Sequence, residues 1–421
     1  MTRLCQGMYL SRVKPQHLWV NLSSAGHWKT EELSARRFLR AILSTIILMV
    51  LMSGCASLPR TALSEADQDA AVIEGFSGIR FWGDGPAGEL GLGGSMSRPQ
   101  MRSGRISYLV LSGGGSGGAY GAGVLAGWSA VGTRPTFDVV SGVSTGALIA
   151  PFAFLGSSYD PILTELYTSG VAETLFKPRP VALFFGPAIS DATPLRHLVA
   201  RYVTNDMLRN IATEHEKGRR FFVVTTNLDA QRTVIWDMGA IAASGDDHAL
   251  DLFRDVLIAS ASIPAVFPPV MIDVKVDGKR FQEMHADGGA TTQLFTAPES
   301  LLASADIDPP IKQGRVDLYI ILNGTLDPEF ESVKSATLAI AGRAYSTLVK
   351  THARSTVNAT YALTQRAGIK FNLTYLDEVV AYKITDPFNT DYMRRLFAIG
   401  HQKAVSGNAW RKRPPAAGSN I

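Results

Sequence analysis

The sequence predicts an α/β fold with a mainly parallel central sheet that is covered by helices on both faces. Short apolar runs typical of buried strands alternate along the chain with segments of helical spacing, and this alternation favours a parallel sheet. The chain has 421 residues, of which 46% are hydrophobic and 19% are charged. This composition supplies a large core and excludes a disordered chain.

The periodic part of the sequence begins near residue 105. An apolar run at 106–111 is bounded by glycines and predicts a buried strand, and helical spacing follows over 119–131. A second strand and helix are expected at 137–140 and 147–155. The remaining expected elements are strands at 221–225, 233–237, 316–322 and 370–376, and long helices within 333–364 and 391–405.

The first residues have the features of a bacterial export signal. A basic patch, Arg36–Arg40, precedes the apolar run Ala41–Met52. This run is shorter than the about 20 residues that a helix needs to cross the bilayer core, but it has the length of the apolar region of a signal peptide. The run ends in Leu51-Met52-Ser53-Gly54-Cys55, which resembles the lipobox of bacterial lipoproteins. This resemblance implies cleavage before Cys55 and acylation of its thiol. An ordinary signal peptide, or a short anchor with a chance cysteine, is the alternative.

Four parts of the chain are therefore expected. Residues 1–54 form a leader, with the lipoprotein signal at about 36–54, and residues 55–104 form a lipidated N-terminus and a glycine-rich tether. Residues 105–390 form the α/β domain, and residues 391–421 form a C-terminal helix with a basic tail. The predicted location is the bacterial cell envelope, with the outer membrane favoured in a Gram-negative cell because Ala56, and not aspartate, follows Cys55.

The charge of the chain resides mainly in its leader. Residues 1–54 hold seven basic and two acidic side chains, whereas the rest holds 34 basic and 35 acidic ones. A near-neutral body indicates no nucleic-acid partner. The only other cysteine, Cys5, precedes the expected cleavage site, so the mature chain has no internal disulfide.

A glycine loop, Ser112–Gly118, connects the first expected strand to its helix. Glycines let backbone N–H groups approach an anion, and a helix N-terminus adds positive partial charge. Gly113, Gly115 and Gly118 match a dinucleotide fingerprint, with Asp138 twenty residues further on, although this acid opens the second strand instead of closing it. A cradle for a tetrahedral oxyanion is the other interpretation.

The second strand runs into Gly142-Val143-Ser144-Thr145-Gly146 and then into a helix. This is G-x-S-x-G in the strand–turn–helix context of a nucleophile elbow. Gly142 and Gly146 support a turn that is too tight for a Cβ. Ser144 is thereby predicted to stand at the carboxyl edge of the sheet as a nucleophile.

A serine nucleophile needs a base to take its proton. The expected mature chain has six histidines, and none stands where an α/β-hydrolase triad predicts one. A different base is offered by Asp287, which ends a strand-like segment and precedes Gly288 and Gly289, although Asp-Gly by itself is a common turn signal. The histidines are His197, His215, His248, His285, His352 and His401.

Four motifs in order resemble the patatin-like phospholipases over about Ile106 to Gln293. They are L-S-G-G-G-x-x-G-A-Y-x-x-G-V-L at Leu111–Leu125, G-V-S-T-G-A-L at Gly142–Leu148, A-S-x-S-I-P-x-x-F-P-P at Ala259–Pro269 and D-G-G at Asp287–Gly289. The resemblance implies a three-layer α/β/α fold, with Ser144 as nucleophile and Asp287 as base. It also implies an oxyanion hole at Gly113, Gly114 and Gly115. It implies that catalysis uses no histidine, no cofactor and no metal.

The sequence departs from that family at two places. Gly117 stands where the family usually has Arg or Lys, and Thr291 and Thr292 follow D-G-G in place of the usual asparagine and proline. The resulting prediction is a membrane-tethered lipid acyl hydrolase that acts on phospholipids or lysophospholipids through an acyl-Ser144 intermediate. The alternatives are a histidine-dependent α/β-hydrolase esterase and a weakly catalytic lipoprotein that binds a lipid or a protein partner.

Overall fold

The computed structural model describes residues 37–45, 60–85, 104–176, 188–303, 315–378, 380–381 and 386–415. The chain divides into two compact units, Met1–Ser57 and Leu58–Ile421. In the first unit, residues 37–45 form a helix within the expected signal peptide. Cys55 and the expected cleavage site lie outside the described residues. None of the helices in the described ranges combines the length and apolar character that a membrane span requires.

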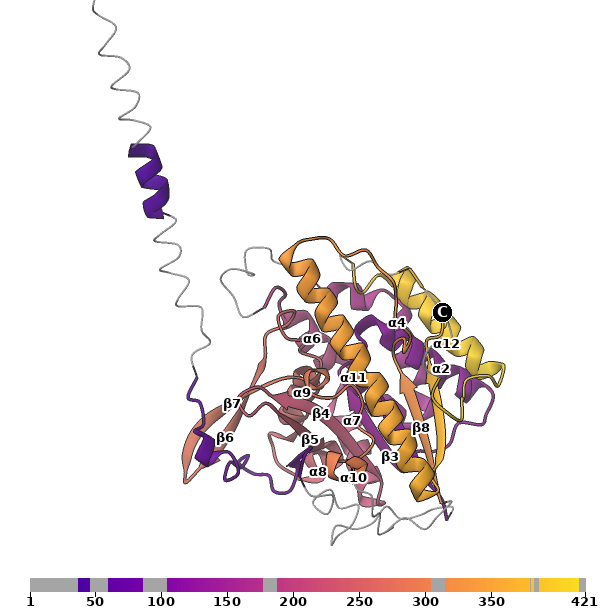
Figure 1. Ribbon diagram of the computed structural model, residues 1–421. Coiled ribbons are helices and arrows are strands. Elements are labelled where there is room, and N and C mark those ends of the chain that lie inside the picture. The colour runs from indigo at the N-terminus through magenta and orange to yellow at the C-terminus, as the bar shows by residue number, and fades with distance from the viewer. Residues whose placement is uncertain are drawn as a thin grey trace, which may run out of the picture. The chain divides into compact units, whose positions relative to one another are not determined.

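The second unit is built on a sheet that contains nine strands in the described part of the chain, and its main run has the order β1-β5-β4-β3-β2-β8-β9 (Figure 1). The central strands from β4 to β9 are parallel, β5 and β1 add an antiparallel edge, and the hairpin β6–β7 joins the end of β4. The strands are β1 (Arg80–Trp82), β2 (Ile106–Leu111), β3 (Val139–Val143), β4 (Arg220–Asn227), β5 (Arg232–Asp237), β6 (Val270–Val276), β7 (Lys279–Asp287), β8 (Val316–Leu322) and β9 (Lys370–Tyr375).

Helices cover both faces of this sheet, which confirms the predicted fold class. Alternate side chains of β2 point to opposite faces, as the strand period requires: Leu109 and Leu111 join one core cluster and Val110 joins another. The second cluster is closed by α11 (Thr337–Ala367). The first cluster is closed by α2 (Gly118–Ala130), α3 (Thr145–Leu155), α4 (Asp160–Thr168), α6 (Thr193–Tyr202), α7 (Asn205–Glu216), α8 (Met238–Ala243), α9 (Ala249–Ser260) and α12 (Thr390–Val405).

The C-terminal helix α12 belongs to the same compact unit as the sheet and packs against α2 (Figure 1). The two helices approach so closely that a Cβ on Gly123 would lie 2.1 Å from the carbonyl oxygen of Phe397, and one on Gly400 would lie 2.2 Å from that of Tyr120. Residues 391–421 are therefore not the separate C-terminal part that the sequence predicts. Periodicity identifies a helix, but it does not identify the surface on which the helix packs.

Part of the expected tether is also built into the sheet. Within residues 60–85, β1 pairs with β5, and Val72 forms an isolated bridge with Lys275 of β6. Strands β1 and β6 were not predicted, because β1 has three residues and β6 alternates buried with more exposed positions. The structure therefore differs from the expected loose entry segment over this stretch.

Candidate active site

Ser144 occupies a sharp turn between β3 and α3. Its φ of 54° and ψ of −124° are unusual for a residue with a side chain, and such strain persists only where the surroundings impose it. A Cβ on Gly142 would lie 2.5 Å from the carbonyl oxygen of Gly146, and one on Gly146 would lie 2.3 Å from that of Leu111. The glycines on either side of Ser144 are therefore required by the turn.

Asp287 lies against this serine. The hydroxyl of Ser144 donates to Oδ2 of Asp287 at 2.5 Å, although the two residues are 143 positions apart in the chain. Asp287 is the last residue of β7, which pairs antiparallel with β4, and β4 lies beside β3. The sheet thus brings together the two residues that the motifs predicted as nucleophile and base.

Asp287 is held through both its carboxyl group and its backbone. Its Oδ1 accepts the N–H of Gly289 at 2.7 Å, and its backbone N–H donates to the carbonyl of Ser262 at 2.9 Å. Thr226 Oγ1 donates to its carbonyl at 2.9 Å. These bonds leave Oδ2 directed at Ser144 with little freedom to rotate.

Burial raises the pKa of Asp287 to about 7. The hydrogen bonds from Ser144 and Gly289 lower this pKa, but burial outweighs them. Only 2% of the residue is exposed, and loss of water disfavours the charged form of a carboxyl group. A base with a pKa near neutrality can take up a proton and return it within one catalytic cycle.

The six candidate histidines lie in the described residues, and none forms a hydrogen bond with Ser144 there. His285 is two residues before Asp287, but its ring bonds to Thr225 Oγ1 at 2.9 Å and to Glu283 Oε2 at 3.0 Å. His215 lies 3.7 Å from Asp237, and His401 stacks on Phe397. This geometry does not support the histidine-dependent alternative.

His285 belongs to a buried polar cluster that the sequence analysis missed. Glu283 is 2% exposed and pairs with Arg80 of β1 as well as with His285. Burial raises the pKa of Glu283, but the hydrogen bond with His285 and the charge of Arg80 outweigh burial and lower that pKa to about 2. The cluster joins the segment before the predicted domain to the strand that ends in Asp287.

The glycine loop passes beside Ser144. A Cβ on Gly113 would lie 3.3 Å from the Cβ of Ser144, and the N–H of Gly113 donates to the carbonyl of Gln293 at 2.9 Å. No hydrogen bond found among the described residues uses the N–H of Gly114 or Gly115. Of the three glycines predicted for an oxyanion hole, these two therefore have the free donors.

Asn323, which follows β8, explains the glycine at position 117. A Cβ there would lie 2.2 Å from the carbonyl oxygen of Asn323, and one on Gly114 would lie 2.1 Å from the same oxygen. Asn323 also donates its side-chain N–H to the carbonyl of Ser112 at 2.7 Å. The loop is thus packed on a backbone carbonyl that occupies the space an arginine or lysine side chain would need.

Other supporting contacts were not predicted from sequence. Ser260 Oγ accepts the N–H of Ser144 at 3.0 Å and donates to the carbonyl of Val224 at 2.6 Å. Thr291 and Thr292 close the turn after Asp287 through backbone bonds to Gly288 at 3.1 and 2.8 Å. Ser260 stands in the motif at Ala259–Pro269, but only the fold shows that it bonds to the nucleophile.

Asp138 does not occupy a nucleotide site. Its Oδ2 accepts the N–H of Ser107 at 2.8 Å, at the start of β2 and β3. In a parallel sheet this is the amino edge. The glycine loop lies at the opposite, carboxyl edge, and the ribose of a dinucleotide would have to lie there as well. The geometry therefore excludes the dinucleotide interpretation.

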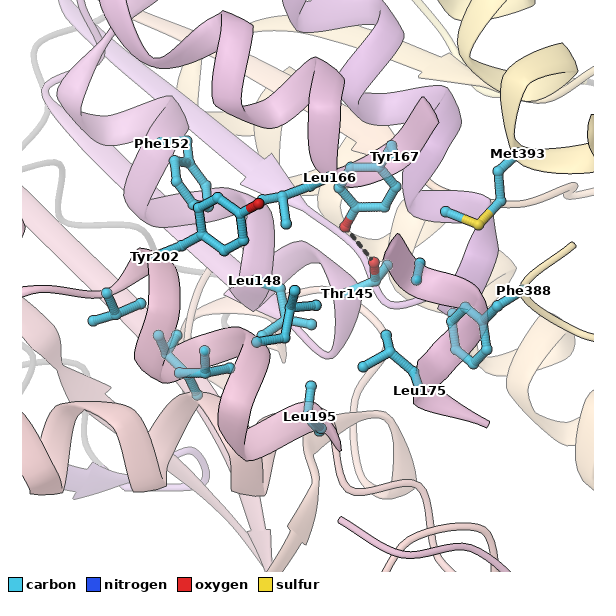
Figure 2. A pocket seen from close by; sticks show the side chains of 16 residues that line it. Thr145, Leu148, Phe152, Leu166, Tyr167, Leu175, Leu195, Tyr202, Phe388 and Met393 are labelled. Carbon is cyan, nitrogen blue, oxygen red and sulfur yellow. Dashed lines mark hydrogen bonds between the residues drawn. The ribbon is translucent and has the colours of Figure 1, made fainter. Parts of the chain in front are cut away.

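An apolar cavity opens next to the elbow, between the helices of the larger core cluster (Figure 2). Gly115 of the glycine loop and Thr145, the residue after the nucleophile, both line it. Figure 2 shows Thr145 bonded to the Tyr167 hydroxyl, at 2.8 Å, among aliphatic and aromatic side chains. The side chains that line the cavity are almost entirely apolar. Its other lining residues include Leu148, Phe152, Leu166, Leu175, Leu195, Tyr202, Phe388 and Met393.

Comparisons with known proteins agree with the motifs. Residues 109–297 match the family model of the patatin-like phospholipases, a range that includes Ser144 and Asp287. The crystal structure of VipD from Legionella pneumophila is similar over 72% of this chain and 67% of its own, with 11% sequence identity and a TM-score of 0.33. No curated protein sequence matches the chain. The family resemblance drawn from the sequence is confirmed.

Asp287→Asn is expected to abolish ester hydrolysis and to stabilise the protein at pH 8. The ordinary carboxyl pKa of 3.8 applies to the unfolded chain, and the folded value is about 7. Between these values the native state holds a proton that the unfolded state has lost, so the stability contributed by this group falls as pH rises and is lowest above pH 7. Thermal unfolding of both proteins from pH 4 to 8 measures the difference. A variant that is less stable than the parent at pH 8 would contradict this assignment.

Gly117→Arg, which restores the family's usual residue, is expected to lower activity and the melting temperature. The side chain would overlap the carbonyl of Asn323, and overpacking of this kind costs about 1–3 kcal/mol. Gly324→Arg is the matched control, because a Cβ there meets only a side-chain atom of Leu322 at 3.9 Å. Higher activity in Gly117→Arg would show that the loop can admit the cation.

Proposed function

Because residues 109–297 form a patatin-like phospholipase domain, we propose that this chain is a serine acyl hydrolase that cleaves carboxylic esters of phospholipids or lysophospholipids. The observation that carries the proposal is the 2.5 Å hydrogen bond from Ser144 to Asp287. The strained elbow, the two free N–H groups and the adjoining apolar cavity support it.

In the acylation step, Asp287 accepts the hydroxyl proton of Ser144 as the serine oxygen attacks the ester carbonyl carbon. The resulting oxyanion accepts hydrogen bonds from the N–H groups of Gly114 and Gly115, which lie beside the helix N-terminus of α2. Collapse of the tetrahedral intermediate breaks the ester C–O bond. Asp287 returns its proton to the departing alcohol, and the acyl group remains on Ser144.

The deacylation step repeats this chemistry with water. Asp287 takes a proton from a water molecule that attacks the acyl-Ser144 carbonyl, and the same N–H groups stabilise the second oxyanion. The bond to Ser144 then breaks, the serine oxygen recovers a proton from Asp287, and a fatty acid leaves. The raised pKa of Asp287 suits a group that gains and loses a proton twice in each turnover.

The apolar cavity is the site for the acyl chain in this proposal. Thr145 and Gly115 line its wall next to the nucleophile and the proposed oxyanion donors, so an acyl group on Ser144 can extend from them into the cavity. Burial of hydrocarbon contributes about 0.8 kcal/mol for each CH₂ group. Such binding favours long-chain lipid esters over small soluble ones.

The N-terminal cysteine provides the membrane attachment in this proposal. Acylation of Cys55 after signal cleavage would hold the catalytic unit at an envelope membrane, where its substrate resides. The support is the basic patch, the apolar run and the small residues before Cys55.

Fatty-acid release from mixed phospholipid vesicles tests the enzymatic proposal, with the full chain in excess chelator. Ser144→Ala and Asp287→Asn are each expected to lower release by about a thousandfold or more, because nucleophile and base act as a unit. His401→Gln is the control and should stay within about twofold of the parent. Release that survives Asp287→Asn would refute the Ser–Asp pair, and loss in His401→Gln would return a histidine to the mechanism.

Leu148→Trp is expected to shift the preference from long to short acyl chains. Leu148 lies on α3 one turn after Ser144 and faces the cavity, so a larger side chain shortens the space for the acyl group. Hydrolysis of palmitoyl esters should fall by at least about tenfold relative to butyryl esters. Leu148→Val is the control. An equal loss on both esters would contradict the placement of the acyl chain.

Cys55→Ser is expected to abolish metabolic labelling of the protein with a palmitate analogue and to release it from the membrane fraction. Cys5→Ser serves as the control, because this cysteine lies upstream of the expected cleavage site. Labelling that persists in Cys55→Ser, or that disappears in Cys5→Ser, would refute the lipoprotein proposal.

A further inference from the structure

Helix α11 is too long for the sheet that it crosses. Its 31 residues span about 46 Å, whereas the seven residues of β8 span about 23 Å. The helix connects two parallel strands, β8 and β9, and only Gly368 and Ile369 separate its end from β9. Its C-terminal end is therefore held at the amino edge of the sheet.

The excess length of α11 must then extend past the carboxyl edge. Ser144 lies at this same edge, because it follows β3, which runs parallel to β2 and β8. Figure 1 shows α11 crossing the sheet and continuing beyond the strands. Burial follows this geometry: Ala353, Val357 and Leu363 of the second half are buried, whereas the first half has no residue in the buried class among those described.

Large apolar side chains are exposed along this overhang and along the loop that leads into it. Phe330 is 99% exposed, Leu348 70% and Ile340 55%, and Val333 and Tyr345 are also exposed. We call residues 330–348 the apolar overhang. The other exposed large hydrophobic residues described in the same unit, Val72, Val131, Leu228 and Val405, are scattered along the chain. Five exposed large apolar residues within this short stretch of the chain indicate an interaction surface.

The overhang carries little unbalanced charge. Residues 330–348 contain three charged residues, Glu331, Lys334 and Arg343, and Arg343 pairs with Glu331. Lys350, at its end, lies 3.3 Å from Glu329. Charges that are paired within the same segment do not select an acidic or basic protein partner. An apolar surface that carries few charges, with one net positive charge over residues 330–348, suits the interfacial region of a bilayer that contains anionic lipid.

The overhang lies at the same edge of the sheet as Ser144 and Asp287. Partial burial raises the pKa of Tyr345 to about 12, and the charge of Asp287 contributes to the rise. Tyr345 therefore lies within electrostatic range of the catalytic carboxyl group.

We propose that the apolar overhang is the surface through which the catalytic edge docks on a phospholipid bilayer. Insertion of Phe330, Ile340 and Leu348 among the acyl chains places the elbow against the lipid surface. A lipid acyl chain can then pass to the cavity beside Thr145 with little exposure to water. The inference rests on the proposed lipid substrate, and it assigns to this stretch of the chain a role separate from catalysis and from the proposed anchor at Cys55.

The test uses the full chain reconstituted in vesicles of phosphatidylethanolamine and phosphatidylglycerol. Phe330→Asp, Ile340→Asp and Leu348→Asp are combined in one variant, and hydrolysis is measured on vesicle lipid and on a soluble butyryl ester. Val131→Asp is the matched control, because Val131 is 40% exposed and follows α2 at the amino edge of the sheet. The triple variant should lose at least about tenfold on vesicles and stay within about twofold on the soluble ester, whereas the control should retain both activities.

Two results would overturn the docking proposal. Vesicle hydrolysis that is unchanged in the triple variant would show that the overhang does not contact lipid. An equal loss on both substrates would show that the segment supports catalysis instead. A second copy of this chain is the competing occupant of the overhang. Sedimentation of the parent and the triple variant in detergent tests for it. A dimer that is present in the parent and lost in the variant would make the overhang a contact between copies of this chain.

A direct readout separates this proposal from the proposed function. Leu348→Trp and Val131→Trp, in the same vesicles, are compared for quenching by brominated phospholipids. Additional quenching, relative to the parent, is expected only in Leu348→Trp, whether or not the protein hydrolyses lipid. Quenching with no hydrolysis would reject the enzyme and retain the docking surface. Hydrolysis without additional quenching would reject the docking surface and retain the enzyme.

Discussion

The constraint that most contacts of the candidate site serve is the burial of the Asp287 carboxyl group against the hydroxyl of Ser144. Burial raises the pKa of this carboxyl to about 7, so the fold bears the free-energy cost of a desolvated acid, which our proposal explains as the cost of holding a base. Several elements share the task. The pairing of β7 with β4 sets its position, and the buried cluster of Arg80, Glu283 and His285 anchors β7 to the segment before the predicted domain.

A second constraint is close approach of backbone to backbone. Parallel strands end at one edge of the sheet, so the glycine loop after β2, the elbow after β3 and the segment after β8 converge there. The carbonyl of Asn323 lies where side chains at positions 114 and 117 would otherwise be, and the elbow admits no Cβ at positions 142 and 146. The glycines are thus a condition for the close approach of the loop, the elbow and the segment after β8.

Two apolar features, the cavity beside Thr145 and the overhang of α11, lie at this carboxyl edge of the sheet together with Ser144. The cavity beside Thr145 gives an acyl chain an apolar site, and the overhang of α11 presents apolar side chains to the outside. These features follow from different elements: the cavity from packing among the helices on one face, and the overhang from a helix about twice as long as its strands. In our proposals, each contributes one part of moving a lipid from a bilayer to Ser144.

The sequence by itself determined the strands at 106–111 and 316–322, the elbow at Ser144 and the acid at Asp287, because each is encoded in a contiguous run of residues. It did not predict the role of Ser260 and Asn323, the burial of Glu283, or the place of β1 in the sheet. These depend on contacts between segments up to 211 residues apart, as in the bonds between Asn323 and Ser112. Only the tertiary structure decided which N–H groups of the glycine loop are free and why position 117 is glycine. Both depend on where the chain after β8 passes, and no local pattern carries that information.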